Sequence, residues 1–245
     1  MNKFWLHKDL VNDNNNGYGQ FSKKHFLLLF ISILFIFFYC VYYINADAAH
    51  KIISLRIIAT TLMIIEVIKF TVMAITKVNV LNNLPLEICS FGAYFIVIDS
   101  ILLNNHIVLQ MLLTLFLPAA IMAILFPTST ALPAINFFTF HQFLYHDLII
   151  AYVAARFING DIIVRYAYVW PAILRLIMIA FVVYIIDCVF DKNFMFLRDS
   201  YGNFMLDIIK KKTGGGIGYT IGLVAFSIFM THIFFVIFKL ISLLI

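Results

Sequence analysis

Two side chains inside long apolar stretches of this chain could cooperate in covalent chemistry. Cys89 carries a thiol and His146 an imidazole. A thiol is a strong nucleophile only as the thiolate, and a neighbouring imidazole can accept its proton. The group that such a pair attacks is an acyl carbonyl, so the two residues are a candidate nucleophile and a candidate general base.

The composition indicates where that chemistry would take place. Of the 245 residues, 64% are apolar and 12% are charged, whereas soluble domains carry about a quarter charged residues. We therefore expect an integral membrane protein. The net charge of +5 does not predict a nucleic-acid partner, because Lys and Arg lie in short segments between apolar runs, where they orient a chain in the bilayer.

Seven apolar segments have the length of about 20 residues that a membrane-spanning helix needs. They are too long and too evenly apolar for barrel strands. The sequence predicts an all-α, polytopic transmembrane helix bundle as one domain over residues 26–245, after a polar tail at 1–25. The segments are Phe26–Ile44, Ile52–Ile75, Leu84–Leu103, Ile107–Phe126, Phe137–Ile158, Tyr166–Val189 and Ile217–Leu244.

The distribution of cationic residues predicts the orientation. Most of them lie in the N-terminal tail and in the connection between the sixth and seventh segments, and Lys and Arg near span ends favour the cytoplasm. We expect a cytoplasmic N-terminus and a multi-pass protein of the plasma membrane. The high content of Asn, Lys, Ile and Phe is typical of AT-rich genomes and suggests a bacterial source.

Both chemical residues lie at a similar predicted depth. The third segment opens LPLEICSFG over residues 84–92, and the fifth contains FHQFLYHD over 140–147. Both segments enter from the predicted cytoplasmic side, so Cys89 and His146 differ in depth by about 6 Å. That depth is close to the ester bonds of the inner leaflet. Gln142 could orient the ring of His146 or stabilise an oxyanion, and Glu87 could also orient it.

The choice of base stays open at this point. His141 lies nearer the span end than His146 and could be the working imidazole, although it points to another helix face. Packing alone could also account for Cys89, because a free Cys usually behaves as a small apolar residue.

At these residues the sequence resembles the YwaF-like integral membrane family, which includes the eukaryotic transmembrane protein 164. Four features carry the resemblance: LPL before Cys89, the turn between Pro127 and Pro133, FLYH ending at His146, and NFMFL beginning at Asn193. The chain departs from the pattern after this last motif, where residues 198 and 199 are Arg-Asp and the family often has Lys-Pro.

The resemblance implies about seven helices and phospholipid acyltransferase chemistry. In it, Cys89 attacks a phospholipid ester, His146 is the general base, and a lysophospholipid takes the acyl chain. Water as the acceptor would make the enzyme a lipase. Asn193, in the last motif, joins the residues expected to bind or orient the substrate. Membrane phospholipids are thus the expected partners, and protein partners are unknown.

No cofactor or metal is expected. The three cysteines, Cys40, Cys89 and Cys188, form no CxxC pair and no Cys/His pair at zinc spacing. The glycines at 214–218 follow three lysines but lack the strand and the GK[ST] ending of a phosphate-binding loop. We expect a hinge there, and a kink at Pro118 in the fourth segment.

Other ionisable residues at membrane depth suggest an alternative function. Glu66 and Lys69 are three residues apart and can pair on one helix face, and Asp99 could contact Arg175. A small transporter or sensor would use such charges as a polar path, and a purely structural bundle would use them to assemble with another protein. The path would consist of Glu66, Lys69, Asp99, Arg175 and His232; we expect Arg56, Arg156 and Asp187 to extend to the membrane surface.

Overall fold

The computed structural model describes residues 3–11, 17–103 and 105–244 as helices and connecting segments, with no strand among them. The predicted all-α, polytopic bundle is therefore confirmed. The α-helices are α1 (Lys23–Asn45), α2 (Ala48–Ile75), α3 (Ile88–Leu102), α4 (His106–Met111), α5 (Leu117–Leu125), α6 (Phe137–Ile158), α7 (Val169–Phe190), α8 (Phe204–Thr213) and α9 (Gly216–Ile241). Short turns are η1 (Lys3–Trp5), η2 (Lys8–Leu10), η4 (Val80–Asn83), η5 (Leu112–Phe116), η6 (Tyr166–Tyr168) and η7 (Phe194–Phe196).

Five helical segments in the described part of the chain are long and apolar enough to cross a membrane: Lys23–Asn45, Ala48–Ile75, His106–Leu125, Tyr166–Phe190 and Gly216–Ile241. The other two predicted spans differ for separate reasons. The helix α3 has only 15 residues, because residues 84–87 before it are extended. The helix α6 has 22 residues but carries polar side chains along its length, and 15 of its residues are buried.

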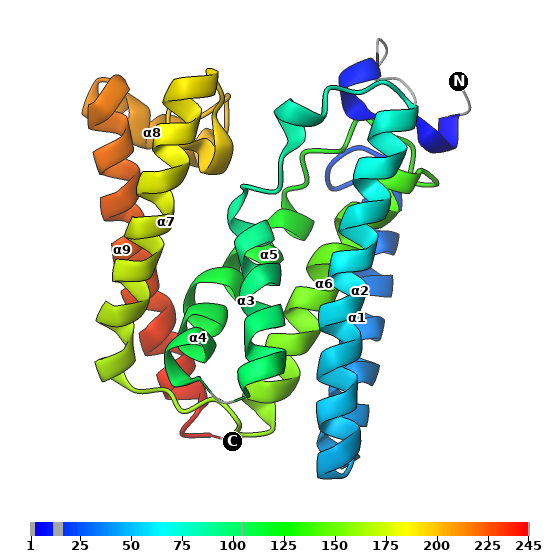
Figure 1. The fold of residues 1–245 in the computed structure, drawn as a ribbon, viewed down its shortest axis with the longest axis vertical. Helices are drawn as coiled ribbons and strands as arrows, with labels where there is room; N and C mark the ends of the chain where they lie inside the picture. Colours follow the sequence, from blue (N-terminus) through cyan, green and yellow to red (C-terminus); the bar gives the residue numbers. More distant parts are fainter. Residues whose placement is uncertain (1–2, 12–16, 104, 245) are drawn as a thin grey trace.

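The helices form two groups (Figure 1). One group contains α1, α2, α3, α5 and α6; the other contains α7, α8 and α9, and the groups meet where α4 packs on α7 and η5 packs on α9. The helix α6 lies at the centre of the first group, with α1, α2, α3 and α5 packed against it. The two ends of the drawn chain lie at opposite ends of the molecule, as the predicted odd number of crossings requires.

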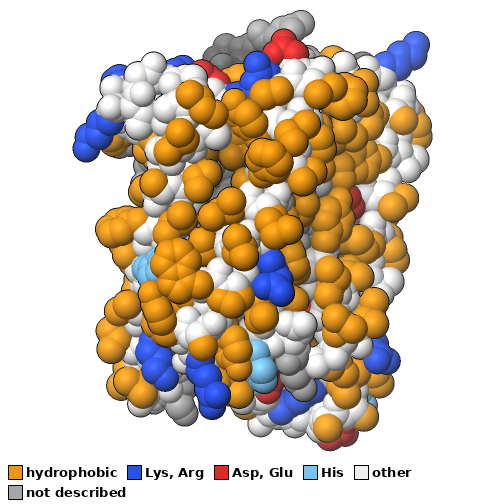
Figure 2. Space-filling view, turned by 60° about the vertical axis from the view of Figure 1, so that its left-hand side comes forward, with side chains coloured by type: hydrophobic (Ala, Val, Ile, Leu, Met, Phe, Trp, Pro, Cys, Tyr) orange, Lys and Arg blue, Asp and Glu red, His pale blue; other side chains and the backbone are white. Residues whose placement is uncertain are grey.

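The outer surface suits a bilayer. The face shown in Figure 2 is largely apolar, and its Lys and Arg side chains gather mainly toward the two ends. Large apolar side chains on α1, α7 and α9 are exposed, among them Phe38, Phe181 and Ile221 at 64% each. Exposed apolar surface of this extent is stable only when lipid covers it.

Polar residues mark the starts of the helices. Ser22, Asp47 and Asn136 precede α1, α2 and α6, and the side chain of each accepts a hydrogen bond from the first turn of its helix. Such caps satisfy backbone N–H groups that have no acceptor within the helix. Asn136 also donates to the carbonyls of Lys3 and Leu6, at 2.9 Å each, and so ties the N-terminal segment to the start of α6.

The predicted kink at Pro118 takes the form of a π-helical turn. Pro118 has no N–H for the carbonyl four residues earlier, and η5, directly before it, is a wider π-helix whose five residues are all buried. At the predicted hinge, Gly214 and Gly215 have φ values of 77° and 78° and form the turn between α8 and α9. Glycine adopts this region readily, unlike other residues.

The structure corrects three predictions about charged residues. Arg156 and Asp187 do not extend to the surface: their exposed fractions are 2% and 0%. Asp99 pairs with Arg156 and not with Arg175; Arg175 is exposed on α7 and donates to the carbonyl of Pro171 at 2.9 Å. The reason is rotation about the helix axis, which turns Arg156 toward the bundle interior and Arg175 away from it.

Candidate functional site

Cys89 is the second residue of α3, at the point where an extended segment becomes a helix. After η4 the chain runs into the body of the molecule before α3 begins (Figure 1). The Tyr94 hydroxyl donates to the Pro85 carbonyl at 3.2 Å and fixes this segment against the helix that follows. Irregular backbone at membrane depth is tolerated where protein covers it or where it lines a cavity.

The N-terminus of α3 keeps unused hydrogen-bond donors. Glu87 is the capping residue, but its side chain makes no capping bond. Its carbonyl accepts the N–H groups of Ser90 and Phe91 at 2.9 and 3.2 Å. Among the described residues, the N–H groups of Ile88 and Cys89 have no acceptor. They lie beside the thiol and could bind an anionic oxygen.

Glu87 lies close to the loop after α7. Its Oε2 atom accepts the N–H of Met195 at 2.9 Å, so the LPLE and NFMFL motifs meet. The expectation that Glu87 orients the imidazole of His146 finds no contact in support within the described chain, because this bond is the one hydrogen bond that its side chain makes there.

Asn193 shapes the same loop. Its amide Nδ2 donates to the Asp199 carbonyl at 2.7 Å, and its Oδ1 accepts the N–H groups of Arg198 and Asp199 at 2.7 and 3.1 Å. The buried Asp187 accepts the N–H of Phe194 at 2.9 Å. The side-chain amide of Asn193 thus stabilises the loop through its own hydrogen bonds. Its expected role toward a substrate stays a prediction.

His146 lies on α6, and its ring is held in one tautomer. Nδ1 is 2.6 Å from the carbonyl oxygen of Gln142; since a carbonyl can only accept, Nδ1 carries the proton. Nε2 then has a free lone pair, and it has no hydrogen-bond partner within the described residues. The Gln142 side-chain amide itself donates to the Ala123 carbonyl at 3.3 Å, so its expected role toward the ring or an oxyanion stays a prediction.

His141 is engaged elsewhere. Its Nε2 lies 3.2 Å from one carboxylate oxygen of Glu66, and Lys69 binds the other oxygen. The predicted Glu66–Lys69 pair on α2 is thus confirmed, with an imidazole from α6 added to it. His141 also stacks on Tyr145, with ring centroids 5.3 Å apart.

Tyr145 connects these groups, and the sequence analysis missed it. Its ring stands edge-on to His146, with centroids 5.7 Å apart. The hydroxyl is buried, and Ser90 on α3 is its polar neighbour. The signal available in the sequence was its place next to His146 in the FLYH motif.

Cys89 thus lies at the start of α3, and Tyr145 and His146 lie on α6, which packs against α3. Cys89 is partly buried and packs against the central apolar core. We call Cys89, Tyr145, His146 and the two unpaired N–H groups of α3 the thiol site.

A second polar cluster lies toward the other end of α6. The Asp99 carboxylate accepts the Tyr152 hydroxyl at 2.6 Å and also binds Arg156. Arg156 reaches Asp161 at 3.5 Å, and Asp161 accepts the Tyr43 hydroxyl at 2.7 Å. We call these five residues the arginine network; they join α1, α3 and α6 at the predicted outer end.

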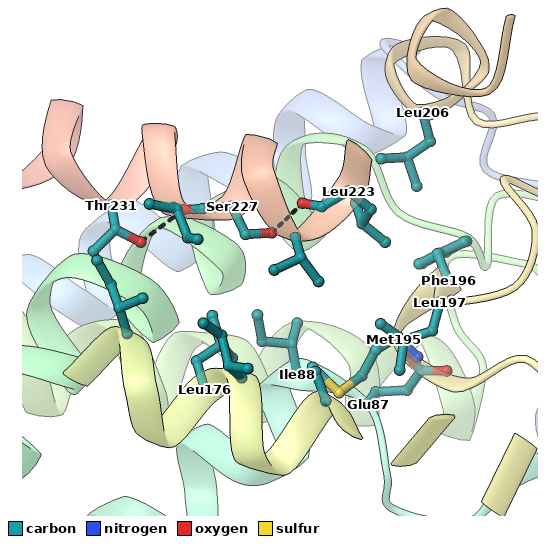
Figure 3. A pocket seen from close by; sticks show the side chains of 15 residues that line it. Glu87, Ile88, Leu176, Met195, Phe196, Leu197, Leu206, Leu223, Ser227 and Thr231 are labelled. Carbon is teal, nitrogen blue, oxygen red and sulfur yellow. Dashed lines mark hydrogen bonds between the residues drawn. The ribbon is translucent and has the colours of Figure 1, made fainter. Parts of the chain in front are cut away.

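An apolar cavity of about 210 Å³ lies between α7 and α9 and reaches the start of α3. Glu87 and Met195 line one end of it, and Thr231 lies at the other (Figure 3). Most of its lining is aliphatic. Cys89 follows two lining residues, Glu87 and Ile88, in the sequence.

No metal site emerges from the described residues, which contain no group of three or more His, Cys, Asp or Glu side chains placed to hold an ion. The thiol site therefore consists of a thiol, an imidazole with a free nitrogen, a phenol and backbone N–H groups. These are the parts of nucleophilic acyl chemistry.

The fold and site define a polytopic helical membrane protein with a cysteine and a histidine on neighbouring helices. The chain belongs to the TMEM164 family, which matches residues 20–240. The predicted relation to the family of transmembrane protein 164 is confirmed. No curated protein and no solved structure matches the chain.

Proposed function

We propose that this protein is an acyltransferase within the membrane, moving a fatty acyl chain from a glycerophospholipid to a lysophospholipid through a thioester on Cys89. The observation that carries the proposal is the tautomer of His146: its Nδ1 proton is held by the Gln142 carbonyl at 2.6 Å. Nε2 is thereby left as a proton acceptor on a helix that packs against α3. The resemblance to transmembrane protein 164 implies the same pair of residues.

In the first step His146 Nε2 takes the proton of the Cys89 thiol. The thiolate attacks the ester carbonyl of the phospholipid and forms a carbon–sulfur bond. The carbon–oxygen bond to glycerol breaks, and the leaving oxygen takes the proton from the imidazolium. The products are an acyl-cysteine and a lysophospholipid, and the histidine is neutral again.

The second step reverses the roles with a different alcohol. Nε2 takes the proton from a hydroxyl of an incoming lysophospholipid, whose oxygen attacks the thioester. The carbon–sulfur bond breaks, and the imidazolium returns its proton to the Cys89 sulfur. No atom is oxidised or reduced, so the cycle needs no cofactor.

The tetrahedral intermediate of each step carries a negative oxygen that needs donors. The N–H groups of Ile88 and Cys89 lack acceptors in the described structure, and the Tyr145 hydroxyl is buried on the neighbouring helix α6. Donors that are already in place stabilise such an oxygen without a reorganisation cost. We assign these three groups to that role.

A transfer assay tests the proposal. The purified protein in phospholipid vesicles receives a phospholipid with a labelled acyl chain and an unlabelled lysophospholipid. We expect labelled diacyl product from the unmodified chain and from Cys188→Ala, a matched control whose thiol is exposed on α7. Cys89→Ala should form none. Absence of transfer in the unmodified chain, or full transfer in Cys89→Ala, would overturn the proposal.

A further inference from the structure

The cavity between α7 and α9 is built for an apolar occupant. Its lining contains two hydroxyl groups, but both are already used: Ser227 donates to the Leu223 carbonyl at 2.9 Å and Thr231 to the Ser227 carbonyl at 2.7 Å (Figure 3). An occupant with polar groups would find few free partners here, and burying polar groups unpaired is costly. The lining thus favours hydrocarbon.

The shape is that of a channel along two helices. The residues of α9 that line it run from Leu223 to Thr231, which is about 12 Å along a helix. The residues of α7 run antiparallel over a similar length, from Ile173 to Ala180. One leaflet contributes about half of the ~30 Å hydrocarbon core, so the channel extends over most of a leaflet.

The two ends of the channel differ. Glu87, whose carboxylate accepts the Met195 N–H, and the first turn of α3 close one end, on the side where η7 and α8 lie. Thr231 lies at the other end (Figure 3). A chain lying in the channel with its carbonyl at the Glu87 end would present that carbonyl beside Glu87 and Ile88, the two residues before Cys89.

We infer that this channel binds a single fatty acyl chain of a membrane phospholipid, with the carbonyl at the Glu87 end, and that Thr231 at the far end limits the chain length accepted. The inference rests on the proposed function, because acyl transfer is the reason for the protein to bind an acyl chain at this place. It adds a binding site and a specificity determinant that the thiol site alone does not define.

Photolabelling tests this without catalysis. Cys89→Ala protein in phosphatidylcholine vesicles receives phosphatidylcholine bearing a diazirine at the end of a decanoyl-length chain, which matches the channel, and mass spectrometry locates the label. We expect label on α7 and α9 lining residues near Thr231. Ala180→Trp, which fills the channel, should reduce that label about tenfold or more, since excluding even two methylenes costs that much.

Matched variants separate the channel from the lipid-facing surface. Met178→Trp places the same side chain on α7 at a position that is 61% exposed, and should leave the label unchanged. Thr231→Phe should reduce labelling by the decanoyl-length probe but spare an octanoyl-length probe, and it serves if Ala180→Trp fails to fold. Label spread over exposed positions, or label that Ala180→Trp and Thr231→Phe leave unchanged, would overturn the inference.

The transfer assay distinguishes this inference from the proposed function. If the channel is labelled but the unmodified protein transfers no acyl group, the binding site is supported and the catalytic proposal is contradicted. Acyl transfer by the unmodified chain, with label found only outside the channel, would remove the binding site and leave the catalytic proposal standing.

Discussion

The two polar clusters on α6 use similar residues in different ways. In the arginine network the Asp99 carboxylate binds both Tyr152 and Arg156 through one oxygen, Oδ2. In the thiol site Nε2 of His146 has no hydrogen-bond partner among the described residues. The charged groups of the arginine network are thus paired with one another. The thiol site, where an imidazole nitrogen is free, is where we propose that the chemistry takes place.

The largest expected effect separates the two histidines of α6. We expect His146→Gln to lower acyl transfer by about 10²–10⁴-fold, the usual contribution of a general base. His141→Gln should cost far less, because His141 is held by Glu66 and is not the assigned base. Transfer rates of both variants under equal vesicle loading provide the measurement. Equal losses, or a larger loss in His141→Gln, would reassign the base.

A second prediction breaks the arginine network. Arg156→Met leaves Asp99, which is fully buried, without its cation and should destabilise the fold by about 3–5 kcal/mol. Adding Asp99→Asn should recover part of the loss, because the uncompensated charge is removed. Equilibrium unfolding in mixed micelles measures both. If Arg156→Met abolished transfer but left the free energy of unfolding unchanged, the network would have a catalytic role and not a structural one.

The same substitution at two positions of α6 sharpens the contrast further. Tyr145→Phe should slow transfer by about 10²-fold, as loss of one oxyanion donor does, and change stability little, since the ring keeps its contacts with His141 and His146. Tyr152→Phe removes the bond to Asp99 and should cost about 1.5–3 kcal/mol of stability with transfer retained. The assignment fails if the two variants behave alike.

The smallest expected effect concerns an ion pair outside the membrane-spanning helices. Lys210 donates to Asp199 and holds the pKa of that carboxyl below its usual value. The stability from this pair is present above the unfolded pKa and is lost as the pH falls through the folded pKa, below about pH 4. The pair is solvent-exposed, so the effect is small.

The melting temperature is measured from about pH 6 to about pH 3. Near the acid end of this range it should fall less in Asp199→Asn than in the unmodified chain. Lys77→Met, a change of a surface lysine with no ion pair in the described structure, is the control. If the melting temperature of Asp199→Asn fell with pH as it does in the unmodified chain, the ion pair would not contribute to stability.

The sequence predicted the elements well where a continuous apolar run defines them. The fifth segment, Phe137–Ile158, has the same bounds as α6, because Asn136 caps its start. The predicted third helix begins too early, because Leu84, Pro85 and Leu86 continue the apolar run but precede the start of α3 at Ile88. Hydropathy does not distinguish an extended segment from a helix at equal depth.

Long-range contacts could be predicted only in part. The Glu66–Lys69 pair follows from spacing within one helix and is confirmed. The partner of Asp99 depends on how α6 and α7 are rotated about their axes, which the sequence does not fix, so Arg175 was named in place of Arg156. The tautomer of His146 depends on a main-chain carbonyl, which residue types cannot indicate.

The acyl-enzyme itself is the most direct test of the account. Protein incubated with a defined diacyl phospholipid and no acceptor is analysed by intact mass and peptide mapping. The account predicts one added acyl group, released by neutral hydroxylamine and located on Cys89, with none on Cys40 or Cys188. Efficient transfer with no adduct on Cys89, or an adduct that persists in Cys89→Ala, would contradict it.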